Sequence, residues 1–138
     1  MREELMAVLR SALFVDFDNI FTRLHEHDPE AAHAFGDSPR DWFGRLATHG
    51  LARGQERRFL FTRIYFPSGN GSSRSFGGTR NRRPNVGQYR RPLVEAGFEV
   101  VDHQPVADGM AHTAGMQLVV DVLASLGNDA PVEEYLLA

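Results

Sequence analysis

The sequence predicts an α/β fold, a three-layer sandwich built on a mainly parallel sheet. Short apolar runs that suit buried strands alternate with segments whose apolar residues recur at helical spacing. Strands that alternate with helices in this way form parallel sheets with right-handed crossovers and helices on both faces. The chain has 138 residues and no internal repeat, so we expect a single domain over residues 1–138.

The first half of the chain contains the two clearest strands. Residues 12–15 are continuously apolar, as in a strand buried on both faces, and residues 59–67 are rich in aromatic and β-branched side chains. Pro39 after a serine is a helix-start signal. In chain order we expect helical turns at 3–10, a strand at 12–15, a weakly periodic helix at 20–27, a loop or broken helix at 28–39, a helix at 39–53 and a strand at 59–67.

The second half alternates helix and strand after a polar interruption. Residues 68–84 are rich in glycine, serine and arginine, so we expect a mobile loop there. Gly97 is a suitable left-handed cap for the helix that precedes it. We expect helices at 86–96 and 113–126 and strands at 98–105 and 133–138.

Composition excludes several classes of function. The chain has no cysteine, so it has no disulfides, no thiolate metal site and no cysteine nucleophile. A membrane-spanning helix needs about 18 consecutive apolar residues, and no run in the sequence is nearly that long. The N-terminal segment lacks the apolar centre of a signal peptide. We therefore expect a soluble, cytoplasmic protein with no membrane contact.

The basic residues are unevenly distributed. All fifteen are arginines, and six of them lie between residues 68 and 94, where there is no acid. Because the guanidinium group forms paired hydrogen bonds with phosphate, this segment predicts binding to a nucleic-acid backbone; the alternative is an ordinary solvated loop. The arginines expected to bind nucleic acid are Arg74, Arg80, Arg82 and Arg83.

Polar residues follow the first strand directly. Asp16, Asp18 and Asn19 interrupt the apolar stretch 12–21, and unpaired carboxylates are costly to bury. Ligands of parallel sheets bind beyond the carboxyl ends of the strands, which predicts that Asp16 lies at the mouth of a cleft holding water, a metal or a phosphate. A turn or a helix N-cap would also explain an aspartate here.

A second acid, Asp121, interrupts an apolar helix. Residues 118–126 are apolar nearly all round, which predicts a buried helix and a carboxylate that needs a partner. That partner is either the functional site or an arginine in a structural ion pair. The six histidines show no spacing typical of a metal site.

The order of these motifs resembles the NYN domains, a family of PIN-like metal-dependent ribonucleases, and in particular their LabA-like branch. The family's D-x-x-N after an apolar strand matches Asp16 to Asn19, and its L-x-x-x-G-F-x-V pattern matches residues 93–100. Its acidic helix motif matches residues 112–123, with Asp121 at the second acidic position. The resemblance covers about residues 12–138 and implies a PIN-like, Rossmann-like sheet.

The resemblance implies roles for three residues. Asp16 would be the first metal-binding acid, Asn19 its polar partner at the site, and Asp121 a second acid. It also implies Mg²⁺ or Mn²⁺ as cofactor and RNA as substrate. In such enzymes the ion activates water for phosphodiester hydrolysis while arginines hold the RNA backbone.

The sequence departs from the family at two points. Gly115 stands where the family usually has an aspartate, and the acidic segment that usually follows the last strand has no counterpart before Ala138. We therefore expect an incomplete domain that binds metal weakly and cleaves RNA poorly or not at all. An open sheet edge at residues 133–138 would favour self-association, so a homodimer is also expected.

Two rival interpretations stay open. A PIN-like module that binds RNA or a partner protein without cutting would explain Gly115. A phosphatase similar to haloacid dehalogenases would use Asp16 as nucleophile and Asp18 as general acid. That family also needs a lysine, which this chain lacks.

Overall fold

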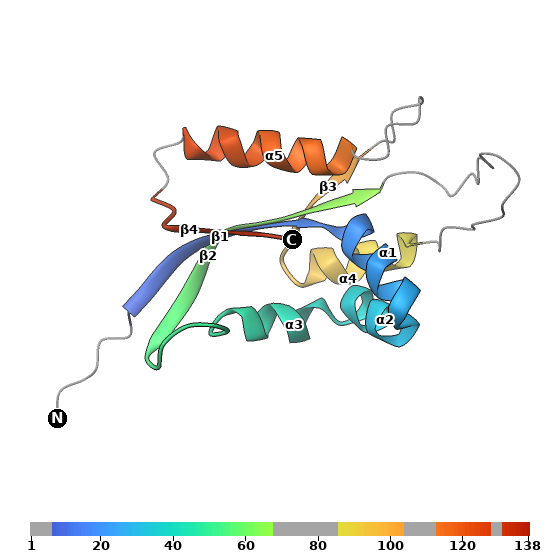
Figure 1. The fold of residues 1–138 in the computed structure, drawn as a ribbon, viewed down its shortest axis with the longest axis horizontal. Helices are drawn as coiled ribbons and strands as arrows, with labels where there is room; N and C mark the ends of the chain where they lie inside the picture. The colour runs from blue at the N-terminus through green and yellow to red at the C-terminus, as the bar shows by residue number, and fades with distance from the viewer. Residues whose placement is uncertain (1–6, 68–85, 104–112, 128–130) are drawn as a thin grey trace, which may run out of the picture.

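The centre of the molecule is a sheet of four parallel strands in the order β3-β2-β1-β4 (Figure 1). The computed structural model of the chain describes residues 7–67, 86–103, 113–127 and 131–138. The predicted α/β class with a parallel sheet is confirmed. The strands are β1 (Ala7–Asp16), β2 (Gln55–Pro67), β3 (Glu99–His103) and β4 (Glu134–Leu137).

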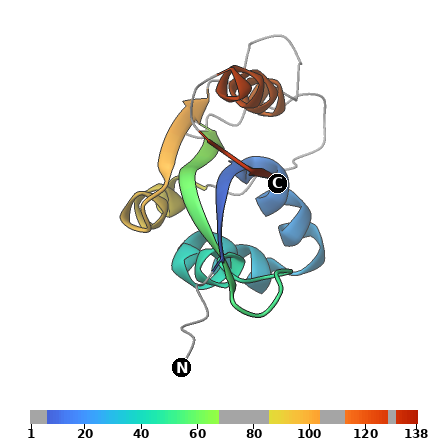
Figure 2. The same ribbon diagram turned by 90° about the vertical axis from the view of Figure 1, so that its left-hand side faces the viewer.

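Helices lie against both faces of this sheet. Figures 1 and 2 show α5 on one face and the other helices on the opposite face. The finer expectation of a three-layer sandwich stays a prediction. No helix within the described ranges is long and apolar enough to cross a membrane. The helices are α1 (Phe17–His27), α2 (Pro29–Asp37), α3 (Pro39–Leu46), the short 3₁₀ turn η1 (Gly87–Tyr89), α4 (Arg90–Glu95) and α5 (Thr113–Leu126).

Alternate residues of β1 enter two separate cores. Leu13 and Val15 belong to the core beneath α1–α4, whereas Ala12 and Phe14 belong to the core beneath α5. This follows from strand geometry, because successive side chains point to opposite faces. Asp16 continues the even-numbered series and therefore points to the α5 side of the sheet.

The strand β1 begins earlier than predicted. The helical turns expected at 3–10 are wrong for residues 7–10, which pair in register with β2 from Ala7 opposite Gln55 to Arg10 opposite Arg58. The apolar spacing there suits a helix, but pairing with the long strand β2 decides the conformation. Residues 3–6 lie outside the described ranges.

Two helices after α1 also differ from expectation. The loop or broken helix expected at 28–39 is largely α2, which Asp28 caps by accepting hydrogen bonds from the amides of Glu30 and Ala31 at 3.1 and 3.2 Å. The helix expected at 39–53 ends at Leu46. The other expected helices and strands are present within one or a few residues of their predicted bounds, apart from residues 104–105, which lie outside the description.

The prediction that α5 is buried is wrong. Leu118 is 7% exposed, but four other apolar side chains of α5 are more than half exposed. A single helix on this face of the sheet can bury only one side, so apolar composition alone did not indicate burial. The loop expected at 68–84, including Arg74, Arg80, Arg82 and Arg83, lies outside the described residues. The exposed residues of α5 are Val119 (53%), Val120 (57%), Leu123 (62%) and Leu126 (58%).

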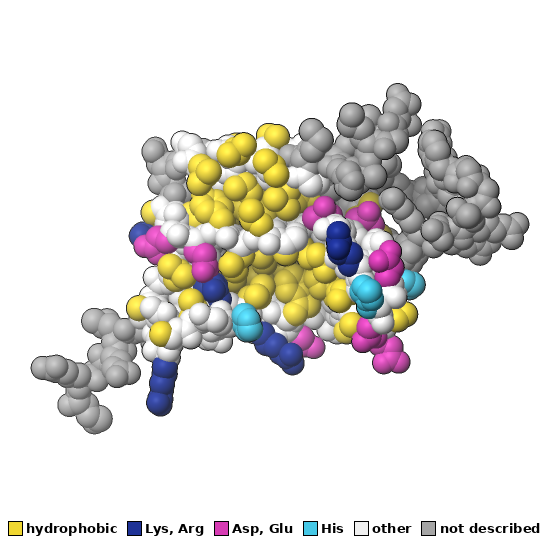
Figure 3. Space-filling model, in the orientation of Figure 1, with side chains coloured by type: hydrophobic (Ala, Val, Ile, Leu, Met, Phe, Trp, Pro, Cys, Tyr) yellow, Lys and Arg dark blue, Asp and Glu magenta, His cyan; other side chains and the backbone are white. Residues whose placement is uncertain are grey.

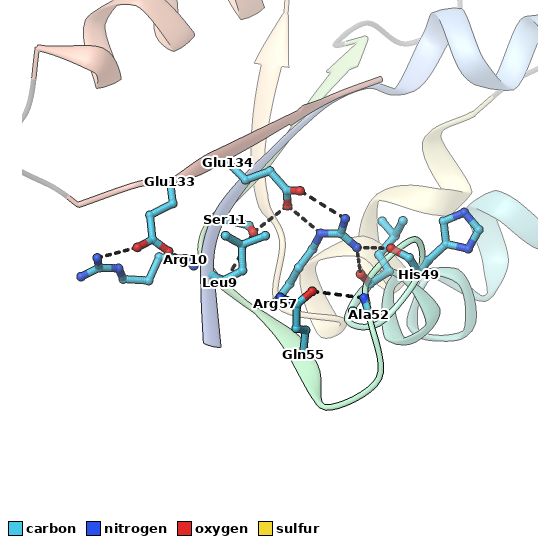
Figure 4. A network of polar contacts seen from close by, with 10 residues as sticks. Leu9, Arg10, Ser11, His49, Ala52, Gln55, Arg57, Glu133 and Glu134 are labelled. Atoms are coloured by element: carbon cyan, nitrogen blue, oxygen red, sulfur yellow. Dashed lines mark hydrogen bonds and ion pairs between the residues drawn. The ribbon is translucent and has the colours of Figure 1, made fainter. Parts of the chain in front are cut away.

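A partly buried ion pair fixes β4 at the amino end of the sheet (Figure 4). The guanidinium of Arg57 donates to Glu134 at 2.6 and 3.2 Å, and its side chain is only 8% exposed. Ser11 Oγ donates to the same carboxylate at 2.8 Å. Arg57 also donates to the carbonyl oxygens of Leu46 and His49, so its side chain joins β2 and β4 to the end of α3 and the turn that follows it.

Candidate functional site

Asp16 is the last residue of β1 and the N-cap of α1. Its Oδ1 accepts a hydrogen bond from the amide of Asn19 at 3.2 Å, and its side chain is partly buried. The helix cap that the sequence left open as an alternative is therefore present. The cap uses the Oδ1 oxygen of the Asp16 carboxylate.

The second oxygen of Asp16 faces the first turns of α5. A β-carbon built on Gly115 would lie 3.9 Å from Asp16 Oδ2, which is an ordinary van der Waals separation. Gly115 is the position at which the resemblance expects an aspartate. The start of α5 and the end of β1 thus meet at the carboxyl edge of the sheet, where parallel sheets bind their ligands.

Asp121 is held further along α5. Its Oδ2 accepts a 2.5 Å hydrogen bond from the hydroxyl of Tyr65, and its Oδ1 accepts one from Gln117 at 2.9 Å. Arg63 lies 3.7 Å away as an ion-pair partner. The Asp121 side chain is 20% exposed and lines a small cleft of about 90 Å³ together with Phe14 and Arg63.

The hydroxyl group of Tyr65 acts as a hydrogen-bond donor to Asp121. Burial, followed by the hydrogen bond to Asp121 and the charge of that carboxylate, raises the pKa of Tyr65 far above its ordinary value. The phenol therefore stays protonated at physiological pH and donates to Asp121. This arrangement corresponds to the structural alternative for Asp121, although its partners are a tyrosine and a glutamine as well as an arginine.

The two acids face the same side of the sheet but contact different residues. Gly115 and Asp121 are six residues apart, which corresponds to about 9 Å along a helix. Asp16 therefore lies beside the start of α5, whereas Asp121 lies over β2. Among the described residues, no three acidic or histidine side chains form a group that could hold a metal ion.

The remaining polar residues after β1 lie on α1. Asn19 is exposed, and its side-chain oxygen accepts a hydrogen bond from Arg23 Nε at 3.2 Å. Asp18 is partly buried in the first turn of the helix. Arg23 thus lies one helical turn beyond Asn19 and about two turns from Asp16, and the sequence alone did not single it out.

Tyr65, Arg63 and Gln117 are the residues that sequence reasoning missed. A signal was present: Arg63 and Tyr65 are two apart on a predicted strand and so share a face, and Gln117 precedes Asp121 by one helical turn. The sequence alone did not show that α5 packs over β2, and this packing brings the three residues to Asp121.

Compared with known proteins, the chain matches no family model, no curated protein and no solved structure. Function must therefore be inferred from the side chains themselves.

Proposed function

We propose that this chain is a PIN-like module that binds a divalent cation at Asp16 and hydrolyses RNA phosphodiester bonds, slowly in the absence of a second acid at Gly115. The observation that carries the proposal is the position of Asp16, at the carboxyl end of a central strand with Oδ2 facing the start of α5. The resemblance to the NYN family supports the same assignment.

The residues around Asp16 suit weak binding of a hard divalent cation. Mg²⁺ and Mn²⁺ take oxygen ligands, and Mg²⁺ is often held by one or two carboxylates with water in its other positions. Gly115 has no side chain, so the space beside Asp16 Oδ2 is not filled from that position. A bound ion would supply an activated water and stabilise charge that develops on the phosphate.

Arginine side chains supply the expected contacts with RNA. Arg23 projects from α1 one turn beyond Asn19 and is exposed. Its guanidinium would hold a backbone phosphate near Asp16, because charge-assisted hydrogen bonds to phosphate are among the stronger polar contacts. Arg74, Arg80, Arg82 and Arg83 remain part of the proposal as further phosphate contacts.

A second candidate is an RNA-binding module that does not cut. The hydrogen bonds of Asp121 to Tyr65 and Gln117, with Arg63 close by, favour it, because they give this acid a structural role. With Gly115 also lacking a carboxylate, Asp16 is left as the sole member of the expected acidic set at this edge among the described residues.

Cleavage and binding assays on one substrate distinguish the two candidates. A labelled single-stranded RNA is incubated with the chain in Mg²⁺, in Mn²⁺ and in EDTA, and the same series is run on Asp16→Asn. Asparagine caps a helix as well as aspartate does, so this variant removes the charge and keeps the fold. Slow cleavage that requires metal and Asp16 supports the nuclease; salt-sensitive binding with no cleavage under any condition supports the second candidate.

A further inference from the structure

β4 is the outermost of the described strands on its side of the sheet. Among the described strands it pairs with β1 alone. Ala138 donates to Phe14 and accepts from Asp16, at 3.0 and 2.6 Å, so its main-chain groups point toward β1. Because alternate residues of a strand direct these groups to opposite sides, Tyr135 and Leu137 direct theirs away from β1.

Three of the usual protections against pairing are missing along residues 135–138 of this edge, although β4 itself is short, with four residues from Glu134 to Leu137. Residues 135–138 contain no charge and no proline, and the pairing of β1 with β4 shows no bulge. The opposite edge strand differs: on β3, Asp102 pairs with Arg90, and Glu99 pairs with Arg63. Charges spread along an edge strand oppose strand addition, and in β4 the charged residue stands at the first position only, so β4 is the edge better suited to it.

Apolar surface flanks β4 on both sides. Figure 3 shows hydrophobic side chains gathered over α5 and, below them, in a second strip on the same face of the molecule. Val120, Leu123 and Leu126 of α5 are more than half exposed, as is Leu137 at 56%. Apolar surface clustered in this way is typical of an interface, whereas single exposed residues are not.

We propose that β4 pairs antiparallel with β4 of a second copy, joining two sheets into one. The two-fold axis passes at Leu136, so that Tyr135 faces the partner's Leu137 and exchanges main-chain hydrogen bonds with it. Leu136 then meets the partner's Leu136 in a pair without hydrogen bonds, where side chains come closest. The two α5 helices lie on the same face of the joined sheet, and their exposed apolar residues cover each other.

A second copy fits this edge because β4 is complementary to itself. A strand inserted between two apolar flanks must be apolar on both faces, and residues 135–138 have that pattern. The antiparallel register sets Glu134 opposite the partner's Ala138, so no acid faces an acid. Glu134 and Glu133 are in addition neutralised within each copy, by Arg57 and Arg10.

The first test is the oligomeric state of the full chain. Sedimentation equilibrium should give a monomer–dimer equilibrium, and Leu137→Lys and Leu123→Glu should each raise the dimer dissociation constant by at least about tenfold. Val94→Lys is the matched control, since Val94 is 50% exposed on α4, on the other face, and should leave the constant unchanged. Circular dichroism checks that each variant is folded.

The second test fixes the register. The chain has no cysteine, so Leu136→Cys introduces a single thiol. Opposed residues in a pair without hydrogen bonds are about 4.5 Å apart between Cα atoms, within the range that a disulfide spans. Mild oxidation should give a covalent dimer of Leu136→Cys and none of Val94→Cys. A chain that stays monomeric at high micromolar concentration overturns the proposal, as does a dimer that Leu137→Lys leaves intact or that Leu136→Cys fails to cross-link.

Discussion

Tyr65 donates its hydroxyl hydrogen to Asp121 and thereby joins β2 to α5. This bond matters because α5 buries little of its surface: Leu118 and Ser125 are its buried side chains among those described. Six residues before Asp121, the same helix passes beside Asp16 at Gly115. Tyr65 thus helps to fix the position of α5, the helix that borders the proposed cation site.

Tyr65→Phe should destabilise the chain by about 1–3 kcal/mol, because it leaves a partly buried carboxylate without its phenol donor. Urea unfolding followed by circular dichroism measures the change. The control is Tyr135→Phe, whose hydroxyl lies 3.3 Å from Ser125 Oγ and makes a weaker, neutral contact. If both variants lose the same free energy of unfolding, the Tyr65–Asp121 hydrogen bond contributes no more to stability than the contact of Tyr135 does.

Glu134 should make stability depend on acid pH. The hydrogen bond from Arg57, assisted by that from Ser11, holds the pKa of Glu134 below its ordinary value. A carboxyl group with a lowered pKa in the folded state stabilises above its unfolded pKa, and that contribution disappears as the pH falls through the folded-state value. Glu134→Gln should therefore lower the free energy of unfolding at pH 7, and the variant should lose less of that free energy than the wild type as the pH falls below about 5.

Glu133→Gln is the matched control for this effect. Glu133 pairs with Arg10 at 2.8 Å, but its side chain is 41% exposed, so water screens the interaction. Its substitution should change the pH profile much less than Glu134→Gln does. Thermal unfolding across the acid range compares the two variants, and a larger effect at residue 133 would contradict the assignment.

Two helical glycines should respond oppositely to alanine. A β-carbon on Gly36 would lie 2.5 Å from the Tyr89 ring, which is buried, so Gly36→Ala should destabilise the chain by about 1–3 kcal/mol. A β-carbon on Gly44 meets nothing within 4 Å, so Gly44→Ala should stabilise α3 by up to about 1 kcal/mol. Urea titrations give both values; destabilisation by Gly44→Ala would contradict the packing described.

The sequence was sufficient for the fold wherever burial and local spacing agree. Residues 12–15 are apolar on both faces, residues 59–67 are rich in aromatic and β-branched side chains, and both segments are strands in the structure. Gly97 has the left-handed φ of 95° expected of a helix cap. Residues 7–10 were misassigned because their conformation depends on pairing with β2, some fifty residues away. The exposure of α5 was missed because apolar composition does not tell which side of a helix meets the sheet.

The candidate site was predictable only in part. Asp16 follows from the rule that polar residues after a buried strand lie at the sheet's carboxyl edge, and its proximity to Gly115 agrees with the order of motifs. The partners of Asp121 were not predictable, since Tyr65 and Arg63 reach it through the packing of a helix on a distant strand. These contacts with Asp121 could be recognised only from the tertiary structure.

Gly115→Asp should strengthen the proposed site. The new β-carbon has room beside Asp16 Oδ2, and two adjacent carboxylates repel each other unless a divalent cation lies between them. The variant should therefore gain more thermal stability from Mn²⁺ than the wild type and should cleave RNA at least about tenfold faster. Gly115→Asn, of equal size but uncharged, is the control; equal gains in both variants would contradict the electrostatic explanation.

The most direct measurement is a Mn²⁺ titration of the full chain followed by electron paramagnetic resonance, which reports the free ion. We expect one weak site in the wild type and a loss of affinity of at least about tenfold in Asp16→Asn, because that substitution removes the ligand charge and retains the helix cap. Identical Mn²⁺ binding by wild type and Asp16→Asn would contradict the assignment of Asp16 as a metal ligand, and with it the proposed function.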